Sequence, residues 1–181
     1  MSTRSTIIIK VKDEDIGKHL TFDSSKLPTQ EDNWGIDGCN DKSIDGVTIE
    51  KKYLAIYCHS DGYLDGLGKT LTEKFTDYET VLNLIVGGDV SYIDKNSILR
   101  YATRNEEFKI QNKIVQEDST WDELKPSQKD SFEYFCDSKC MNDFVYLFEN
   151  DCWSYCTFNN HIFRDVAKDI QKNDFFASEF C

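Results

Sequence analysis

The stretch from Tyr53 to Leu71 constrains the fold more than any other part of the chain, because its hydrophobic period changes within a few residues. Its first part, Tyr53–Cys58, is an uninterrupted apolar and aromatic run, which is typical of a buried strand. After a polar turn, Leu64, Leu67 and Leu71 recur with the spacing of an amphipathic helix. The sequence therefore predicts a strand, a turn and a helix in immediate succession.

The turn between these two elements is rich in glycine, and we predict that its role is structural. Glycine adopts a positive φ at little cost and also lets another chain segment approach closely. Asp-Gly pairs favour turns for the same reason. The residues predicted to form this structural turn are His59, Asp61, Gly62, Gly66 and Gly68.

His59 and Asp61 also allow an enzymatic interpretation of the turn. An imidazole beside a carboxylate at the end of a strand is the core of general base catalysis. The chain has no glycine-flanked serine of the kind that forms a nucleophile elbow. We therefore favour a structural arrangement in which Asp61 bonds turn amides and His59 packs beneath Tyr63. A small hydrolase or nucleotide-modifying enzyme is the alternative.

Two comparisons with ligand-binding loops fail on spacing. Gly68-Lys69-Thr70 matches the end of a Walker A loop, but Tyr63 stands where the first glycine is required. Asp61, Asp65 and Glu73 lack the alternating carboxylates of a calcium-binding EF-hand. The sequence therefore predicts no nucleotide, calcium or other cofactor.

The chain has seven cysteines, an odd number that rules out complete internal pairing. In a reducing compartment they are expected as free thiols or metal ligands. Four of them form two pairs at four-residue spacing, which shares a face on either a helix or a strand. We predict no bound metal, with zinc as the alternative at Cys136, Cys140, Cys152 and Cys156.

The remaining patterns predict an α+β fold in which a twisted antiparallel sheet has helices packed on one side. Strands are expected over Thr6–Lys12, His19–Phe22 and Val47–Glu50, with an aromatic hairpin over residues 144–158. Helices are expected over Leu64–Phe75, from the Thr76-Asp77 cap to Gly87-Gly88, from Pro126 to about Cys140, and from His161 to Lys172 after an Asn160 cap. We expect a single domain over residues 1–181, with a long irregular loop at about 23–46 and a C-terminal subdomain at about 119–181.

Charge restricts the classes of partner. The net charge of −12 disfavours nucleic acid as a direct ligand, because phosphate binding needs clustered Lys and Arg. It favours a protein with a basic groove, although acidity alone also serves solubility. No apolar run has the length of a membrane span or a signal peptide, so we expect no membrane contact and a cytoplasmic location. The acidic residues expected to contact the partner are Asp37, Asp41, Asp45, Glu117, Asp118, Asp122 and Glu123.

Several segments together resemble a family of small proteins from phages and mobile elements. They are the opening Met1–Ile7, the Tyr57-Cys58-His59-x-Asp61-Gly62-Tyr63 core, Gly66-x-Gly68, and Gly88-Asp89-Val90-Ser91. The resemblance covers roughly residues 1–12 and 53–92. It implies a mobile-element origin and attaches no catalytic mechanism to these residues.

An acidic protein of this origin without a catalytic signature is expected to block a host protein. Host defence nucleases carry basic grooves for guide RNA and target DNA. The sequence therefore predicts an inhibitor of a host nuclease, most specifically an anti-CRISPR protein acting on a Cas9-type enzyme. The alternatives are the enzyme described above and a phage accessory protein that forms a homodimer through its phenylalanine-rich tail, Asp174–Cys181.

Overall fold

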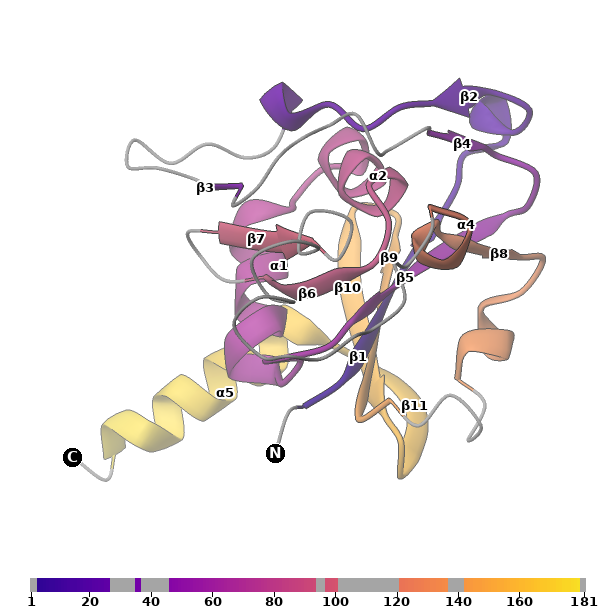
Figure 1. Ribbon diagram of the computed structural model, residues 1–181. Coiled ribbons are helices and arrows are strands. Elements are labelled where there is room, and N and C mark those ends of the chain that lie inside the picture. Colours follow the sequence, from indigo (N-terminus) through magenta and orange to yellow (C-terminus); the bar gives the residue numbers. More distant parts are fainter. Residues whose placement is uncertain are drawn as a thin grey trace, which may run out of the picture.

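The computed structural model describes residues 3–26, 35–36, 46–93, 97–100, 121–136 and 142–179. It confirms an α+β fold, in which one large sheet carries most of the core (Figure 1). The strands are β1 Ser5–Lys10, β2 His19–Leu20, β3 Gly35–Ile36, β4 Val47–Thr48, β5 Tyr53–Cys58, β6 Val90–Ile93, β7 Ser97–Arg100, β8 Ser127–Lys129, β9 Phe144–Glu149, β10 Cys152–Thr157 and β11 Asn160–Asp165. The α-helices are α1 Lys69–Lys74, α2 Tyr78–Val86, α4 Trp121–Leu124 and α5 Val166–Glu179. Short helical turns are η1 Asp13–Asp15, η2 Ser24–Lys26, η4 Leu64–Gly68 and η6 Phe132–Phe135.

The large sheet is mixed, which corrects the expectation of an antiparallel one. Its order is β11-β10-β9-β1-β5-β6-β7-β3, with β8 also paired to β5, while β2 and β4 form a separate pair. β1 runs antiparallel to β5 but parallel to β9, and the pairs β5–β6 and β3–β7 are parallel too. Parallel neighbours need a long crossover, and η4, α1 and α2 form that crossover between β5 and β6. The predicted strand, turn and helix are therefore the first half of a crossover.

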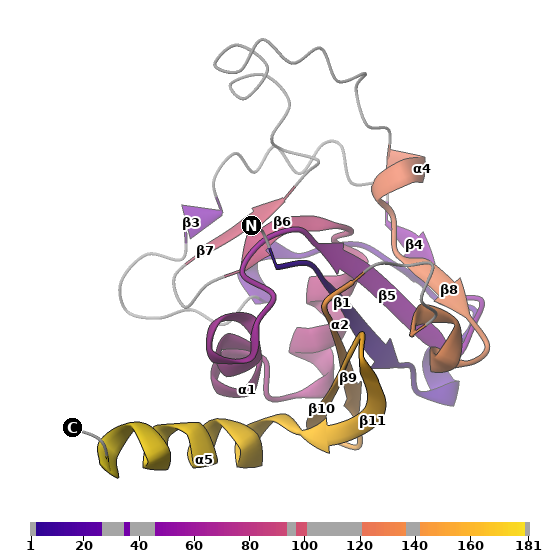
Figure 2. The same ribbon diagram turned by 90° about the horizontal axis from the view of Figure 1, so that it is seen from below.

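Helices pack on one face of the sheet, as expected (Figure 2). Ile7 and Ile9 of β1 and Ile56 of β5 project to this helical face, where they join buried side chains of α1, α2 and α5. The alternate residues, such as Ile8 and Ala55, project to the opposite face. Among the described residues, those that cover this second face are in η6 and at Phe163 of β11.

The predicted helix before the double glycine is confirmed with its caps. Asp77 is the N-cap of α2, and its Oδ1 accepts a hydrogen bond from the Thr80 amide at 2.9 Å. After α2, Gly88 has a φ of 81° and its amide donates to the Ile85 carbonyl at 2.9 Å. The preceding helix begins as the π-turn η4 and continues as α1.

The predicted helix from Pro126 to about Cys140 is wrong. Its first residues form β8, in which Gln128 pairs with Leu54 of β5, and its middle forms only the short turn η6. Proline suits the first turn of a helix, but it equally suits an edge strand. The hydrogen bonds that these residues form with the edge of β5 favour the strand over the helix.

The predicted helix from His161 to Lys172 begins too early. Residues 160–165 form β11, which pairs with β10, and α5 starts at Val166. Asn160 does accept a hydrogen bond from the Ile162 amide, at 3.1 Å, but both residues belong to the start of β11. The cap of the real helix is Asp165, whose Oδ1 accepts from the Lys168 amide at 2.9 Å.

The predicted aromatic hairpin is confirmed as β9 and β10. Asn150 and Asp151 form its turn with φ values of 54° and 56°, which matches the twist that two-residue hairpins require. β9 lies directly beside β1, so side chains of the hairpin enter the same core as α1 and α2. Among the described helices, none is long and apolar enough to cross a membrane.

Candidate functional site

The N-terminal segment, the end of β5 with the turn after it, and the segment around Asp89 meet at one end of the sheet. The Gly62 amide donates to the Thr3 carbonyl at 3.0 Å, which joins the turn to the N-terminal segment. The Tyr57 amide donates to Asp89 Oδ1 at 2.8 Å, and the His59 amide donates to the Val90 carbonyl at 3.2 Å. Residues far apart in the sequence thus form one structural unit around the end of β5.

Close approach, rather than positive φ, explains the glycine at position 62. The residue with positive φ is the preceding Asp61, at 57°, whose carbonyl accepts from the Leu67 amide at 3.1 Å. A Cβ added at Gly62 would lie 2.7 Å from both Cβ and Oγ of Ser5. The Gly62 carbonyl also accepts the buried Tyr146 hydroxyl at 2.8 Å. The turn is therefore fixed between β1 and β9.

His59 is engaged with Tyr57, two residues earlier on the same face of the chain. Its Nδ1 lies 2.9 Å from the Tyr57 hydroxyl, and the two rings meet edge to face at 5.9 Å. Tyr63, beneath which the sequence placed His59, lines a hollow together with Asp61.

Asp89 is a site residue that sequence reasoning missed. Burial raises the pKa of its carboxyl group to about 6, although the hydrogen bond from the Tyr57 amide favours the charged form. Its own amide donates to the Leu124 carbonyl at 2.8 Å. The one available signal was the position of the carboxylate, directly after a double glycine and directly before a short apolar run.

We expect Asp89→Asn to stabilise the protein at neutral pH and to have little effect at about pH 4. Because the folded-state pKa is raised, the favourable contribution of the protonated carboxyl is complete below the unfolded pKa and is lost as pH rises through about 6. The amide oxygen of Asn still accepts from Tyr57. The expected gain at pH 7.5 is about 1–2 kcal/mol.

Chemical denaturation between pH 4 and pH 8 measures this effect as the difference between wild type and variant. Asp130→Asn, which removes an exposed carboxylate, is the control for a lost surface charge. A difference that stays constant across the range would contradict the assignment.

An open hollow of about 330 Å³ lies beside the glycine turn, and we call it the acidic hollow. Asp65, Lys69 and Glu73 follow one another at four-residue spacing along η4 and α1, so they share a face. Tyr63 is 44% exposed and adds an aromatic ring. The residues that line the acidic hollow are Asp61, Tyr63, Asp65, Gly66, Lys69, Thr70, Glu73 and Ile93. Three carboxylates, one lysine and an aromatic ring can receive a cationic side chain.

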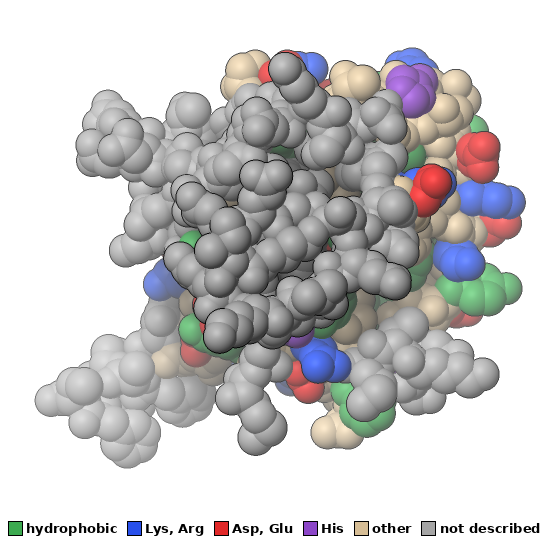
Figure 3. All heavy atoms as spheres, viewed as in Figure 1, with side chains coloured by type: hydrophobic (Ala, Val, Ile, Leu, Met, Phe, Trp, Pro, Cys, Tyr) green, Lys and Arg blue, Asp and Glu red, His purple; other side chains and the backbone are tan. Residues whose placement is uncertain are grey.

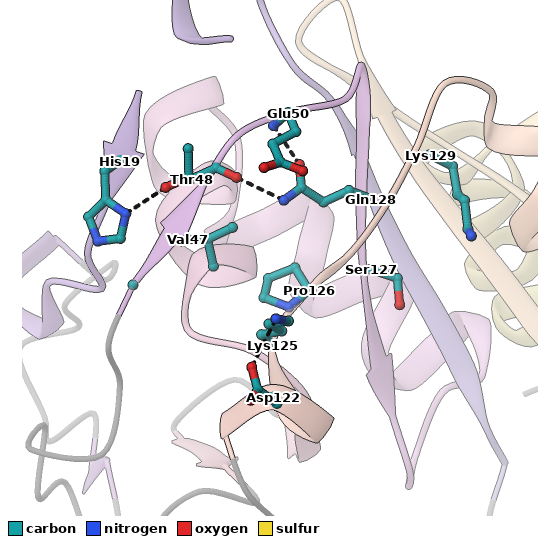
Figure 4. A pocket seen from close by; sticks show the side chains of 11 residues that line it. His19, Val47, Thr48, Glu50, Asp122, Lys125, Pro126, Ser127, Gln128 and Lys129 are labelled. Carbon is teal, nitrogen blue, oxygen red and sulfur yellow. Dashed lines mark hydrogen bonds and ion pairs between the residues drawn. The ribbon is translucent and has the colours of Figure 1, made fainter. Parts of the chain in front are cut away.

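A larger polar groove of about 680 Å³ lies between β4 and the segment that contains β8 (Figure 4). Gln128 holds its two sides together, because its Nε2 donates to the Thr48 carbonyl at 2.9 Å and its Oε1 accepts from the Glu50 amide at 2.8 Å. Asp122 lies at one end and forms an ion pair with Lys125 at 2.9 Å. Acidic and basic side chains are interspersed on this side of the molecule (Figure 3). The polar groove therefore has a more balanced mixture of acidic and basic side chains than the acidic hollow.

Asp122 is the one predicted partner-binding residue whose side chain the structure describes, and that side chain is 84% exposed. Glu123 belongs to helix α4. The other predicted contacts, Asp37, Asp41, Asp45, Glu117 and Asp118, lie outside the described residues. Their role remains a prediction.

The four cysteines considered for zinc are distributed differently from the expectation. Cys136 hydrogen bonds to Cys156, and both side chains contact the apolar cluster on the second face. Cys152 is exposed and lies four residues along β10 from Cys156, which separates their Cα atoms by about 13 Å. Cys140 lies outside the described residues. Within the described part of the chain, no three His, Cys, Asp or Glu side chains are grouped to hold a metal ion.

Comparisons with known proteins do not place the chain in a family. No protein-family profile, curated protein or solved structure matches it. The resemblance to phage and mobile-element proteins therefore stays a prediction, and the functional argument depends on charge and geometry.

Proposed function

We propose that the protein binds and inhibits a host protein with a basic groove, most specifically an RNA-guided nuclease of the Cas9 type. The observation that carries the proposal is the acidic hollow, in a chain of net charge −12. Such nucleases hold nucleic acid in a positively charged channel. An acidic protein that occupies this channel competes with the phosphate groups that the channel normally binds.

The acidic hollow suits a cationic side chain from the wall of such a channel. A guanidinium group can stack on the exposed ring of Tyr63 while Asp61 and Asp65 neutralise its charge. Lys69 lies between Asp65 and Glu73 on the helix and reduces repulsion between them. The hollow thus combines charge with an apolar contact, as the centre of a protein interface does.

Charge should determine how fast the two proteins associate. We expect the association rate constant to fall as salt rises from 0.05 to about 0.5 M, because exposed charges are screened beyond about 8–10 Å at physiological ionic strength. Dissociation should change less, since it depends on the packed centre of the interface. The triple variant Asp61→Asn/Asp65→Asn/Glu73→Gln should weaken inhibition about 10-fold.

A variant of equal charge tests whether position matters. Asp130→Asn/Glu133→Gln/Asp151→Asn removes three exposed carboxylates away from the acidic hollow, and asparagine tolerates the positive φ of position 151. We expect inhibition by this control to stay within about 2-fold of wild type. Target-DNA cleavage by a purified Cas9–guide complex, together with binding kinetics across the salt series, provides the measurement. Salt-independent association with full potency in both variants would contradict the proposal.

The predicted contacts of the loop and central segments extend the same test. Neutralising Asp37, Asp41 and Asp45, or the group Glu117, Asp118, Asp122 and Glu123, should weaken inhibition without unfolding the protein, because loop carboxylates are rarely needed for a core. Unchanged potency in both would restrict the contact to the acidic hollow.

A small hydrolase or nucleotide-modifying enzyme is the second candidate, and the observation that favours it is Asp89. A carboxyl group with a pKa of about 6 lies at the strand end that also carries the His59–Tyr57 contact, and perturbed groups gather at active sites. His59→Ala separates the candidates. An enzyme would lose its activity with the fold intact, whereas a blocking protein should keep most of its inhibition.

A further inference from the structure

Two thiols from distant segments meet on the second face of the sheet, away from the acidic hollow and the polar groove. Cys136 directly follows η6, and Cys156 lies in β10, opposite Val145 of β9. Cys156 belongs to the apolar cluster on this face, and Cys136 packs against the same cluster. The strand and the helical turn thus bring together two side chains that are twenty positions apart in the sequence.

The side chains of Cys136 and Cys156 are hydrogen-bonding neighbours. The hydrogen bond lowers the pKa of the Cys156 thiol, although burial opposes this, and raises the pKa of the Cys136 thiol. The Cys136 thiol also donates to the Phe132 carbonyl, one turn earlier, at 3.7 Å between sulfur and oxygen. Cys156 is therefore the member of the pair that more readily becomes a thiolate, which is the reactive form.

The surroundings hold η6 in place and leave access for a small reagent. The rings of Phe132 and Phe163 meet edge to face at 5.4 Å, which fixes η6 against β11. Cys136 is half-buried and lines an open hollow of about 820 Å³ together with both of these rings. Cys136 lines the hollow and Cys156 is only 2% exposed, so we expect hydrogen peroxide to reach the pair from the Cys136 side and a protein thiol to be excluded.

We propose that Cys136 and Cys156 form a reversible oxidation site that a peroxide converts into an intrachain disulfide. The Cys156 thiolate attacks one oxygen of hydrogen peroxide, the O–O bond breaks, and the departing hydroxide takes up a proton to become water. Cys136 then attacks the resulting sulfenic acid, so that the S–S bond forms, the S–O bond breaks and a second water leaves. Two thiols are oxidised and one peroxide is reduced to two waters. A small thiol or dithiol reverses the step by exchange.

The disulfide would attach η6 covalently to the sheet. It closes a loop that includes all of β9 and most of β10, and it restricts the unfolded chain, which stabilises the oxidised protein. For a chain of this length we expect the melting temperature to rise by about 5–10 °C. The inference stands apart from the proposed function, because it needs no partner.

Mild treatment with hydrogen peroxide, followed by alkylation and peptide mass mapping, tests the site. The expected product has lost two free thiols and two hydrogen masses, with Cys136 linked to Cys156. Dithiothreitol should restore both thiols and the original melting temperature. Cys152→Ser, which removes the exposed thiol on the same strand, should form the same link with the same rise in melting temperature.

Cys136→Ser and, separately, Cys156→Ala should abolish the link and the rise in melting temperature. Cys136 is half-buried, so its variant is expected to fold and gives the decisive result even where Cys156→Ala does not. Recovery of both thiols unmodified in wild type, or a disulfide that joins either of them to a different cysteine, would overturn the proposal.

Discussion

Replacing Gly62 by valine should lower the free energy of unfolding by about 2–4 kcal/mol, because the site has no room for a side chain. Even a Cβ would lie 2.7 Å from the Ser5 side chain and 3.0 Å from the Thr3 carbonyl oxygen. That carbonyl accepts the Gly62 amide, and Ser5 is completely buried in β1, so neither neighbour can move without disturbing the sheet. Urea denaturation measures the loss.

Gly17→Ala is the matched control, since it introduces the strain of a positive φ without a close neighbour. Gly17 has a φ of 91° and nothing within 4 Å of an added Cβ, so alanine there meets strain but no neighbour. The expected cost is about 1 kcal/mol. If Gly62→Val cost no more than this, close approach would be the wrong explanation for the glycine.

Where local signals agreed, the fold could be predicted from the sequence. The crossover from β5 into α1 was visible because a strand-like run, a glycine turn and helical spacing follow one another directly. The hairpin of β9 and β10 was visible because two aromatic runs flank Asn150-Asp151. The parallel pairing of β1 with β9 could not be predicted, because no turn links the two strands and only their burial side by side decides the register.

The absent helix after Pro126 and the late start of α5 show how a sheet edge overrides local preference. Pro126 and Asn160 are both legitimate helix-start signals, yet each is followed by residues that pair with a strand. β8 pairs with β5 and β11 pairs with β10, so in both places tertiary hydrogen bonds outweigh the helical spacing. The sequence alone does not show that β5 and β10 offer free edges, because this depends on the order of the strands in the sheet.

The candidate site was predictable to a similar extent. Turn chemistry located the turn after β5, because that chemistry is local, but the close approach of Gly62 to Ser5 depends on the fold. The raised pKa of Asp89 and the contact of Cys136 with Cys156 depend on burial and on neighbours distant in the sequence. The zinc alternative paired each cysteine with one four residues away, whereas the sheet and η6 pair Cys136 across the fold with Cys156.

Replacing Trp153 by alanine should have the largest effect on stability, about 3–5 kcal/mol. Its indole is 6% exposed and lies 5.0 Å from the Phe148 ring, between centroids, so truncation leaves a cavity in the core. Its Nε1 also donates to the Phe75 carbonyl at 2.7 Å, at the end of α1, where a helix lacks internal donors for its last carbonyls. The side chain therefore joins the hairpin to the crossover helix.

Trp153→Phe separates the hydrogen bond from the packing. It keeps an aromatic ring but leaves the buried Phe75 carbonyl without this donor, at a cost of about 1–3 kcal/mol. Tyr134→Ala, at a ring that is 65% exposed, should stay within about 0.5 kcal/mol of wild type. Hydrogen exchange adds a local measurement, because the Phe75 amide, which donates to the Leu71 carbonyl, should exchange faster in Trp153→Phe if the bond holds the end of α1. Equal stability and equal exchange in Trp153→Phe and wild type would mean that the indole contributes through its volume alone.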